Sequence, residues 1–190
     1  MCSRRRPGSS GRLFALALAG ALLAMGAAPA AAETATGPSA ADLRGYVAEV
    51  EPIRDGVNRL LDTADPLLER WRDHRITGTQ AAAAMGALEQ RFAAYTTQIT
   101  ALVPADPTLQ RVNAPYAHTY LLEDAYLRAL AAALPSRAFG SLPLTASQQR
   151  TAIVVWRNQV EALGRALRVA LPRDLQHAGR GDIAPSPTGS

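Results

Sequence analysis

The chain has 190 residues, of which 20 are basic, 16 are acidic and one is cysteine. Every basic residue is an arginine; four of these precede residue 33, whereas all the acidic residues follow residue 32, so the remainder of the chain is nearly neutral. The basic overall balance therefore does not indicate nucleic-acid binding, and the position of the single cysteine, Cys2, excludes disulfides and thiolate metal sites after residue 32.

Residues 1–32 have the three parts of an export signal: an arginine-rich start, an apolar run over 13–28 and an A-x-A cleavage pattern over 30–32. The apolar run is shorter than the ~18 to 20 residues of a membrane-spanning helix. We therefore expect a cleaved signal peptide and a protein that is secreted or held in the cell envelope. An uncleaved anchor, and export by the Sec or the twin-arginine route, stay open. Arginine without lysine in an alanine-rich chain is typical of a GC-rich bacterial genome.

A polar leader over 33–38 ends at Ser39, which forms a capping pattern with Asp42 and predicts the start of a helix. Apolar residues then recur every three or four positions as far as Trp71. Pro52 and Pro66 interrupt this segment, but the apolar phase continues through both. The pattern therefore favours one long helix, kinked by proline, over several separate helices.

Two more helices follow, each with its own start signal. Thr77 and Gln80 form a capping box ahead of a helix that extends to about residue 103. Asp106, followed by proline, starts the third helix, which Pro115 is expected to kink. One stripe of this third helix is predicted to be buried: Leu109, Val112, Tyr116, Tyr120, Glu123, Leu127, Leu130 and Leu134.

A loop over 136–144 precedes a capping pair, Thr145 and Gln148, and a fourth helix that is expected to end at Pro172. The predicted organisation is a signal peptide over 1–32, a leader over 33–38, a bundle over 39–171 and a flexible tail over 172–190. Four amphipathic helices with short connections predict an all-α, up-down-up-down four-helix bundle.

The middle of this bundle holds the candidate site. At the height of Glu123 in the third helix, the first and fourth helices should bring Arg54 and Arg157, with the two tyrosines beside them. The tentative ligand-binding residues are Tyr116, Tyr120, Glu123, Arg54 and Arg157. Two interpretations stay open: a polar pocket that binds a ligand, or a buried Glu–Arg pair that fixes the register of the helices.

Other signals of chemistry are weak. The sequence lacks G-x-S-x-G, H-E-x-x-H and a glycine-rich phosphate loop, so we predict no catalytic residues, no metal site and no cofactor. His118 lies opposite the apolar stripe and is expected at the surface. The arginines of the fourth helix could form a basic strip for an anionic partner, but Glu161 is spaced for ion pairs with Arg157 and Arg165.

These observations favour a non-enzymatic binding or interaction module outside the cytoplasmic membrane. Its expected partner is an unidentified protein or cell-envelope component, not nucleic acid, and no transmembrane segment is expected once the signal is removed. The alternative is a carrier of a small ligand, haem or a metal that uses the polar mid-bundle layer.

Overall fold

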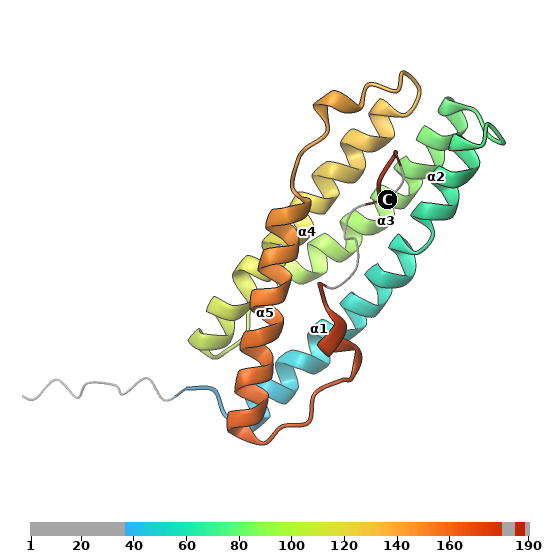
Figure 1. Ribbon diagram of the computed structural model, residues 1–190. Coiled ribbons are helices and arrows are strands. Elements are labelled where there is room, and N and C mark those ends of the chain that lie inside the picture. Colours follow the sequence, from blue (N-terminus) through green and yellow to red (C-terminus); the bar gives the residue numbers. More distant parts are fainter. Residues whose placement is uncertain (1–36, 180–184, 189–190) are drawn as a thin grey trace, which may run out of the picture. The chain divides into compact units, whose positions relative to one another are not determined.

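The computed structural model describes residues 37–179 and 185–188, and all regular structure in these two ranges is helical (Figure 1). The predicted signal peptide over 1–32 and most of the leader lie outside the described residues. The elements are α1 (Ala40–Leu61), α2 (Ala64–Arg72), α3 (Gly78–Ala101), α4 (Pro107–Ala133), the 3-10 helix η1 (Phe139–Ser141), α5 (Ala146–Leu167) and the 3-10 helix η2 (Asp174–His177). The prediction of an all-α protein is confirmed.

The first predicted helix is divided into α1 and α2, so the expectation of one continuous helix was wrong. Pro52 lies inside α1 without ending it, and the break falls at Asp62 and Thr63. Pro66 has no N–H to donate to the carbonyl of Asp62, which removes a helical hydrogen bond there. Thr63 Oγ1 also donates to the carbonyl of Leu60 at 2.6 Å, a local bond that competes with the helical ladder. Apolar spacing did not reveal the break because the buried face continues across it.

The predicted starts of α1, α3 and α4 are confirmed. Ser39 with Asp42, and Thr77 with Gln80, form reciprocal capping boxes. The carboxylate of Asp106 accepts hydrogen bonds from the first free N–H groups of α4 at 2.8 and 3.0 Å. All eight residues predicted for the buried stripe of α4 are buried.

α5 begins where it was predicted, with Thr145 at its N-cap, but the capping bond and the end of the helix differ from the prediction. Thr145 has a helical backbone conformation, and its side chain makes no capping hydrogen bond. At the other end the helix stops at Arg168, four residues before Pro172, where the backbone is left-handed with φ of 54°. The N–H of Val169 then bonds to the carbonyl of Gly164 at 2.9 Å. Leu171 folds back onto the helix here, so an added Cβ at Gly164 would lie 2.8 Å from its side chain and would require that side chain to shift.

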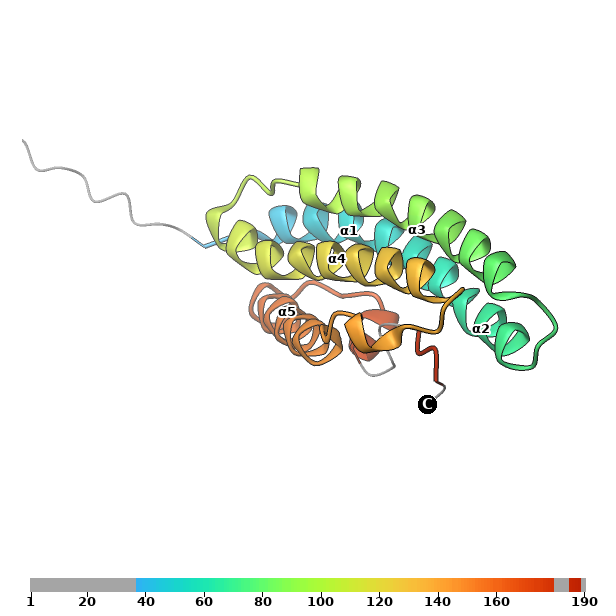
Figure 2. The same ribbon diagram turned by 90° about the horizontal axis from the view of Figure 1, so that it is seen from above.

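The helices enclose a core to which each contributes one face (Figures 1 and 2). α3 packs against α1, α2 and α4, whereas α5 packs mainly on α4 and touches α1 at fewer places. The space between α1 and α5 is covered by the segment over 172–179, called here the C-terminal cover, which contains η2. Among the described residues, no helix has both the length and the apolar character to cross a membrane.

The C-terminal cover is part of the segment that we expected to be a flexible tail. Leu175 of η2 is only 1% exposed and joins the core. Farther along, the carbonyl of Pro185 accepts a hydrogen bond from Tyr126 Oη at 2.7 Å, and that of Ser186 accepts one from Arg72 at 3.1 Å. The described parts of this segment therefore contact the helices instead of extending away from them.

Candidate functional site

Four of the five residues predicted for the mid-bundle site line one cavity of about 340 Å³, called here the mid-bundle cavity. Arg54 comes from α1, and Tyr116, Tyr120 and Glu123 come from α4, as their helical spacing predicted. Further wall residues come from α1, α3, α4, α5 and the C-terminal cover: Val57, Asn58, Leu61, Asp62, Phe92, Thr119, Ile153, Asp174, His177, Ala178 and Gly179.

The fifth predicted residue, Arg157, does not line this cavity. Its Nη1 donates a hydrogen bond to the carbonyl of Ala178 at 2.9 Å, so it contacts the C-terminal cover from outside. Its position follows from the packing of α5, which presents Trp156 and Val160 to the core and turns Arg157 toward the cover. Arg157 therefore holds part of the cavity wall in place without facing the interior.

Glu123 is the least expected group in the cavity wall, because it is a carboxyl group that is only 2% exposed. Its Oε2 accepts a hydrogen bond from Gln149 Nε2 at 2.9 Å. Its Oε1 has no hydrogen-bond partner among the residues that the structure describes. Burial raises the pKa of Glu123 to about 8, although the Gln149 hydrogen bond opposes this shift. Near neutral pH the group is therefore largely protonated, and one of its two buried oxygens lacks a partner.

Gln149 was missed by the sequence reasoning although it is fully buried. It lies on α5 four residues before Ile153 and seven before Trp156, so it continues the apolar stripe of that helix. A polar residue at a stripe position was the available signal. An apolar pattern by itself does not predict a buried amide, so Gln149 was not predicted as a site residue.

Arg54 is 5% exposed and does not form the predicted pair with Glu123. Its Nη1 instead donates to Glu51 at 2.7 Å, one turn earlier in α1, and to Asp174 of η2 at 3.1 Å. Burial raises the pKa of Glu51 to about 7. For Asp174, desolvation acts to raise the pKa, but its bonds with Glu51 and Arg54 outweigh this effect and hold it below the usual value. The ion pair therefore attaches the C-terminal cover to α1.

The same region contains a group of three acids, Glu51, Asp55 and Asp174, whose carboxylate oxygens lie within 4.8 Å of one another. The guanidinium of Arg54 already supplies a positive charge to two of these three acids. A metal ion would have to compete with this buried cation, so the group is explained as part of the Arg54 ion-pair network.

Aromatic side chains make the cavity wall rigid. Tyr116 stacks on Trp156 with ring centroids 4.1 Å apart, and Tyr120 stacks on Phe92 at 5.8 Å. The hydroxyls of the two tyrosines are hydrogen-bonded to each other at 3.0 Å. Burial raises both tyrosine pKa values, that of Tyr120 to about 12, so both hydroxyls stay neutral at physiological pH. Trp156 Nε1 donates to Tyr46 Oη at 2.7 Å, which ties this wall to α1.

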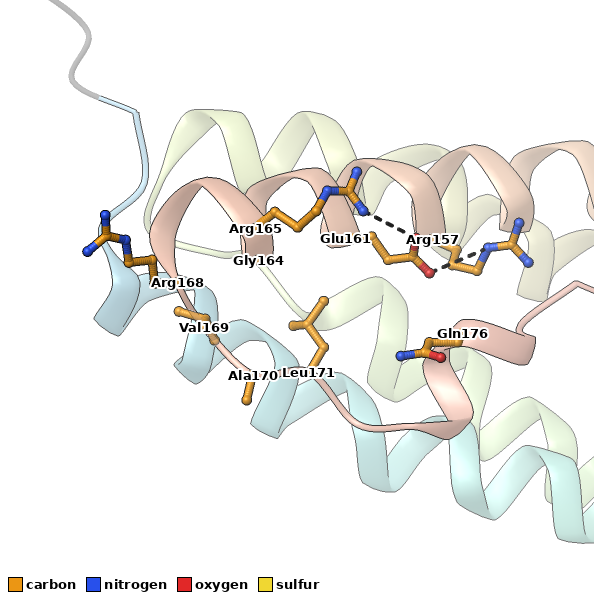
Figure 3. A pocket seen from close by; sticks show the side chains of 9 residues that line it. All are labelled: Arg157, Glu161, Gly164, Arg165, Arg168, Val169, Ala170, Leu171 and Gln176. Carbon is orange, nitrogen blue, oxygen red and sulfur yellow. Dashed lines mark ion pairs between the residues drawn. The ribbon is translucent and has the colours of Figure 1, made fainter.

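A second hollow, of about 590 Å³, lies on the outer side of α5 and the chain that follows it (Figure 3). Its arginines are Arg157, Arg165 and Arg168, and Glu161 lies between the first two, at 4.0 and 3.8 Å. Figure 3 shows these predicted ion pairs as dashed lines. This hollow is larger than the mid-bundle cavity, but its one acid pairs with two of its three arginines.

His118, which was predicted to lie at the surface opposite the apolar stripe of α4, is exposed.

Comparison with known proteins does not assign a role to either cavity. No family model matches the chain, and neither a curated protein nor a solved structure was found to match it. The role of the site has to be inferred from its own geometry. The mid-bundle cavity is the stronger site because its wall contains a buried, unpartnered polar atom.

Proposed function

We propose that the protein is a non-enzymatic, exported up-down-up-down helical bundle that binds a small molecule in the mid-bundle cavity. The observation that carries this proposal is a wall residue of the cavity, Glu123, whose Oε1 atom is buried and has no hydrogen-bond partner among the described residues. Leaving such an atom unsatisfied costs about 1–3 kcal/mol. A ligand that bonds to this oxygen removes the cost.

The size and the wall of the cavity support a small ligand. A volume of about 340 Å³ is at the lower end of the range for ligand pockets and corresponds to roughly ten water molecules. Its wall combines apolar side chains with a few polar groups at fixed positions, as is usual for binding sites of small molecules. A volume of this size favours the small-ligand form of the carrier hypothesis over haem.

The place of action follows from the predicted signal peptide. We propose that the mature protein, beginning near residue 33, binds its ligand outside the cytoplasmic membrane of a bacterium. A protein or cell-envelope partner that receives the ligand is part of this proposal, and its identity stays open.

Native mass spectrometry tests the proposal. The full chain, expressed with its own leader in a bacterial host and recovered after export, should carry an extra mass that is lost on denaturation. The same spectrum should show that residues 1–32 have been removed. The size of the extra mass would give the ligand class.

Two variants of α5 provide the control. Ile153→Phe adds volume to the cavity wall and should abolish the extra mass, whereas Val155→Phe, at an exposed position of the same helix, should keep it. A bare mass for the wild type, or an equal adduct on both variants, would contradict binding in this cavity.

A further inference from the structure

The charges around the mid-bundle cavity are mainly acidic. α1 contributes Arg54 and Asp62, the C-terminal cover contributes Asp174 and His177, and α4 contributes Glu123. The described wall residues of α3 and α5, Phe92 and Ile153, carry no charge. Because Arg54 is already bonded to Glu51 and Asp174, the cavity offers no free guanidinium to an anionic ligand.

Glu123 is the buried acid in this cavity wall, and in the part of the chain that the structure describes it has no charged partner. Its hydrogen-bond partner is a neutral amide, that of Gln149, which leaves the buried Oε1 of this wall residue without a partner among the described residues. A buried carboxylate is stable in its charged form only when a cation pairs with it. A ligand with a hydrogen-bonding cation would supply that partner, whereas a carboxylate ligand would bring a second buried acid without a cation.

The rest of the wall suits an apolar ligand body beside a cation. Aliphatic side chains come from α1 and α5, and three aromatic side chains from α3 and α4: Phe92, Tyr116 and Tyr120. Aromatic rings favour a neighbouring cation through the negative charge of their faces. The two tyrosine hydroxyls are hydrogen-bonded to each other, so this side of the wall requires fewer hydrogen bonds from a ligand.

Resting on the proposed binding at the mid-bundle cavity, we infer that the ligand is a small organic amine with an apolar body. Its ammonium group donates a hydrogen bond to Oε1 of Glu123 and pairs with the carboxylate, and its apolar part packs against Phe92 and Ile153. The C-terminal cover completes the binding site, because residues 174, 177, 178 and 179 form part of the same wall.

This assignment has a proton balance that can be measured. The amine arrives as an ammonium ion, and Glu123 is largely protonated before binding because its pKa is raised to about 8. Formation of the ion pair therefore displaces the proton of Glu123 into the solvent, about one proton per ligand at pH 7 and far less than one at pH 9.5. Among the other titratable wall groups, Arg54 and the two tyrosines keep their protons throughout, and Asp62, Asp174 and His177 lie on the exposed side. Glu51, whose pKa is raised to about 7, is bonded to Arg54 and is not a wall residue, so the comparison with Glu123→Gln assigns the released proton.

Isothermal titration calorimetry with three probes of one shape tests the ligand class. The probes are 2-phenylethylamine, 2-phenylethanol and phenylacetate, and the protein is the full mature chain, stripped of any co-purified ligand. The amine should bind at least tenfold more tightly than the alcohol and the carboxylate. Titrations in two buffers with different ionisation enthalpies should show release of close to one proton at pH 7.

Glu123→Gln provides the decisive variant, because it keeps the size of the side chain and removes its charge. It should lose the tenfold preference for the amine and the proton release, while Glu161→Gln, outside the cavity on α5, should keep both. The proton release of the wild type is a second measurement that does not depend on any variant.

The failures are distinguishable. If the alcohol or phenylacetate binds as tightly as the amine, or if Glu123→Gln binds the amine like the wild type, the amine assignment is overturned while binding in the cavity stands. If none of the probes binds at millimolar concentration, the assignment is also overturned. The adduct experiment with Ile153→Phe then decides by itself whether the cavity binds a small molecule.

Discussion

At the scale of single residues, Glu123 shows how position determines chemistry. The same acid on the outer face of α4 would be solvated, as the exposed residues of that face are. Its place in the buried stripe removes water from the carboxyl group, and the resulting loss of solvation raises its pKa. The Gln149 amide satisfies one oxygen but supplies no charge. Glu123 therefore remains a neutral acid in the unliganded fold and becomes charged only when a cation enters.

Glu123→Gln should flatten the pH dependence of stability. The pKa of Glu123 is about 8 in the folded protein and 4.5 in the unfolded chain, so the folded state holds an extra proton between these values. The free energy of unfolding of the wild type therefore falls as the pH rises from 5 to 8. The loss from this group is up to about 4 kcal/mol. Urea unfolding at pH 5 and pH 8 measures the difference, which should be smaller in the variant by several kcal/mol.

Glu69→Gln, at an exposed position of α2, is the matched control and should change stability equally at both pH values. Glu51, whose pKa is also raised, keeps its contribution in every protein of this comparison. If the curves of wild type and Glu123→Gln run parallel from pH 5 to pH 8, Glu123 does not hold the extra proton.

At the scale of elements, the helix ends show where local signals are sufficient. The starts of α1, α3 and α4 follow from adjacent residues whose side chains bond to free N–H groups, so the sequence reports them directly. The end of α5 has a different origin. The helix stops at Arg168, a residue with no special preference for the left-handed conformation, because Leu171 packs back against Gly164.

Arg168→Gly should therefore stabilise the protein by about 0.5–1 kcal/mol. Glycine adopts the left-handed conformation without the steric cost that arginine has, although it also gains freedom in the unfolded chain. The matched control is Arg165→Gly, inside the last turn of the same helix, which should destabilise by about 1 kcal/mol. Thermal unfolding of both variants measures the effects, and destabilisation by Arg168→Gly would contradict this account of the helix end.

At the scale of the whole described fold, the C-terminal cover determines whether the mid-bundle cavity exists as a closed site. α5 and α1 touch at few places, and η2 fills part of the space between them with Leu175. The cover is attached by the Arg54–Asp174 ion pair, by the Arg157–Ala178 hydrogen bond and by this single buried leucine. Apart from these contacts, Ala178 of the cover also packs against the core.

Leu175→Ala should release the cover without unfolding the helices. Truncating a buried leucine removes most of the apolar contact of η2, and local opening requires much less free energy than global unfolding. Hydrogen exchange of the amides of Gln176 and Ala178 should become about tenfold faster or more, while amides in the middle of α4 change little. Gln176→Ala, an exposed change in the same turn, should leave exchange nearly unaltered. Equal acceleration in α4 would mean that cover and helices unfold together.

The sequence by itself determined the helical class, three of the helix starts and the buried stripe of α4. These features are local: capping bonds join residues three apart, and the stripe repeats with the period of the helix. The same periodicity placed Tyr116, Tyr120 and Glu123 on one face of α4, and the expected height of Arg54 along the bundle placed it at the level of Glu123. It could not give their partners, because a hydrogen bond between α4 and α5, or between α1 and η2, depends on how far each helix is shifted along its neighbour.

Only the tertiary structure decided that Glu123 is bonded to Gln149 instead of an arginine, and that Arg54 is neutralised from both its own helix and the C-terminal cover. It also decided that the chain after α5 returns to the helices. A polar segment with one leucine carries no periodic signal, and its position is fixed by contacts with residues more than a hundred positions away, such as that between Asp174 and Arg54. Long-range contacts of this kind leave no pattern in the neighbouring sequence, so they follow only from the packed fold.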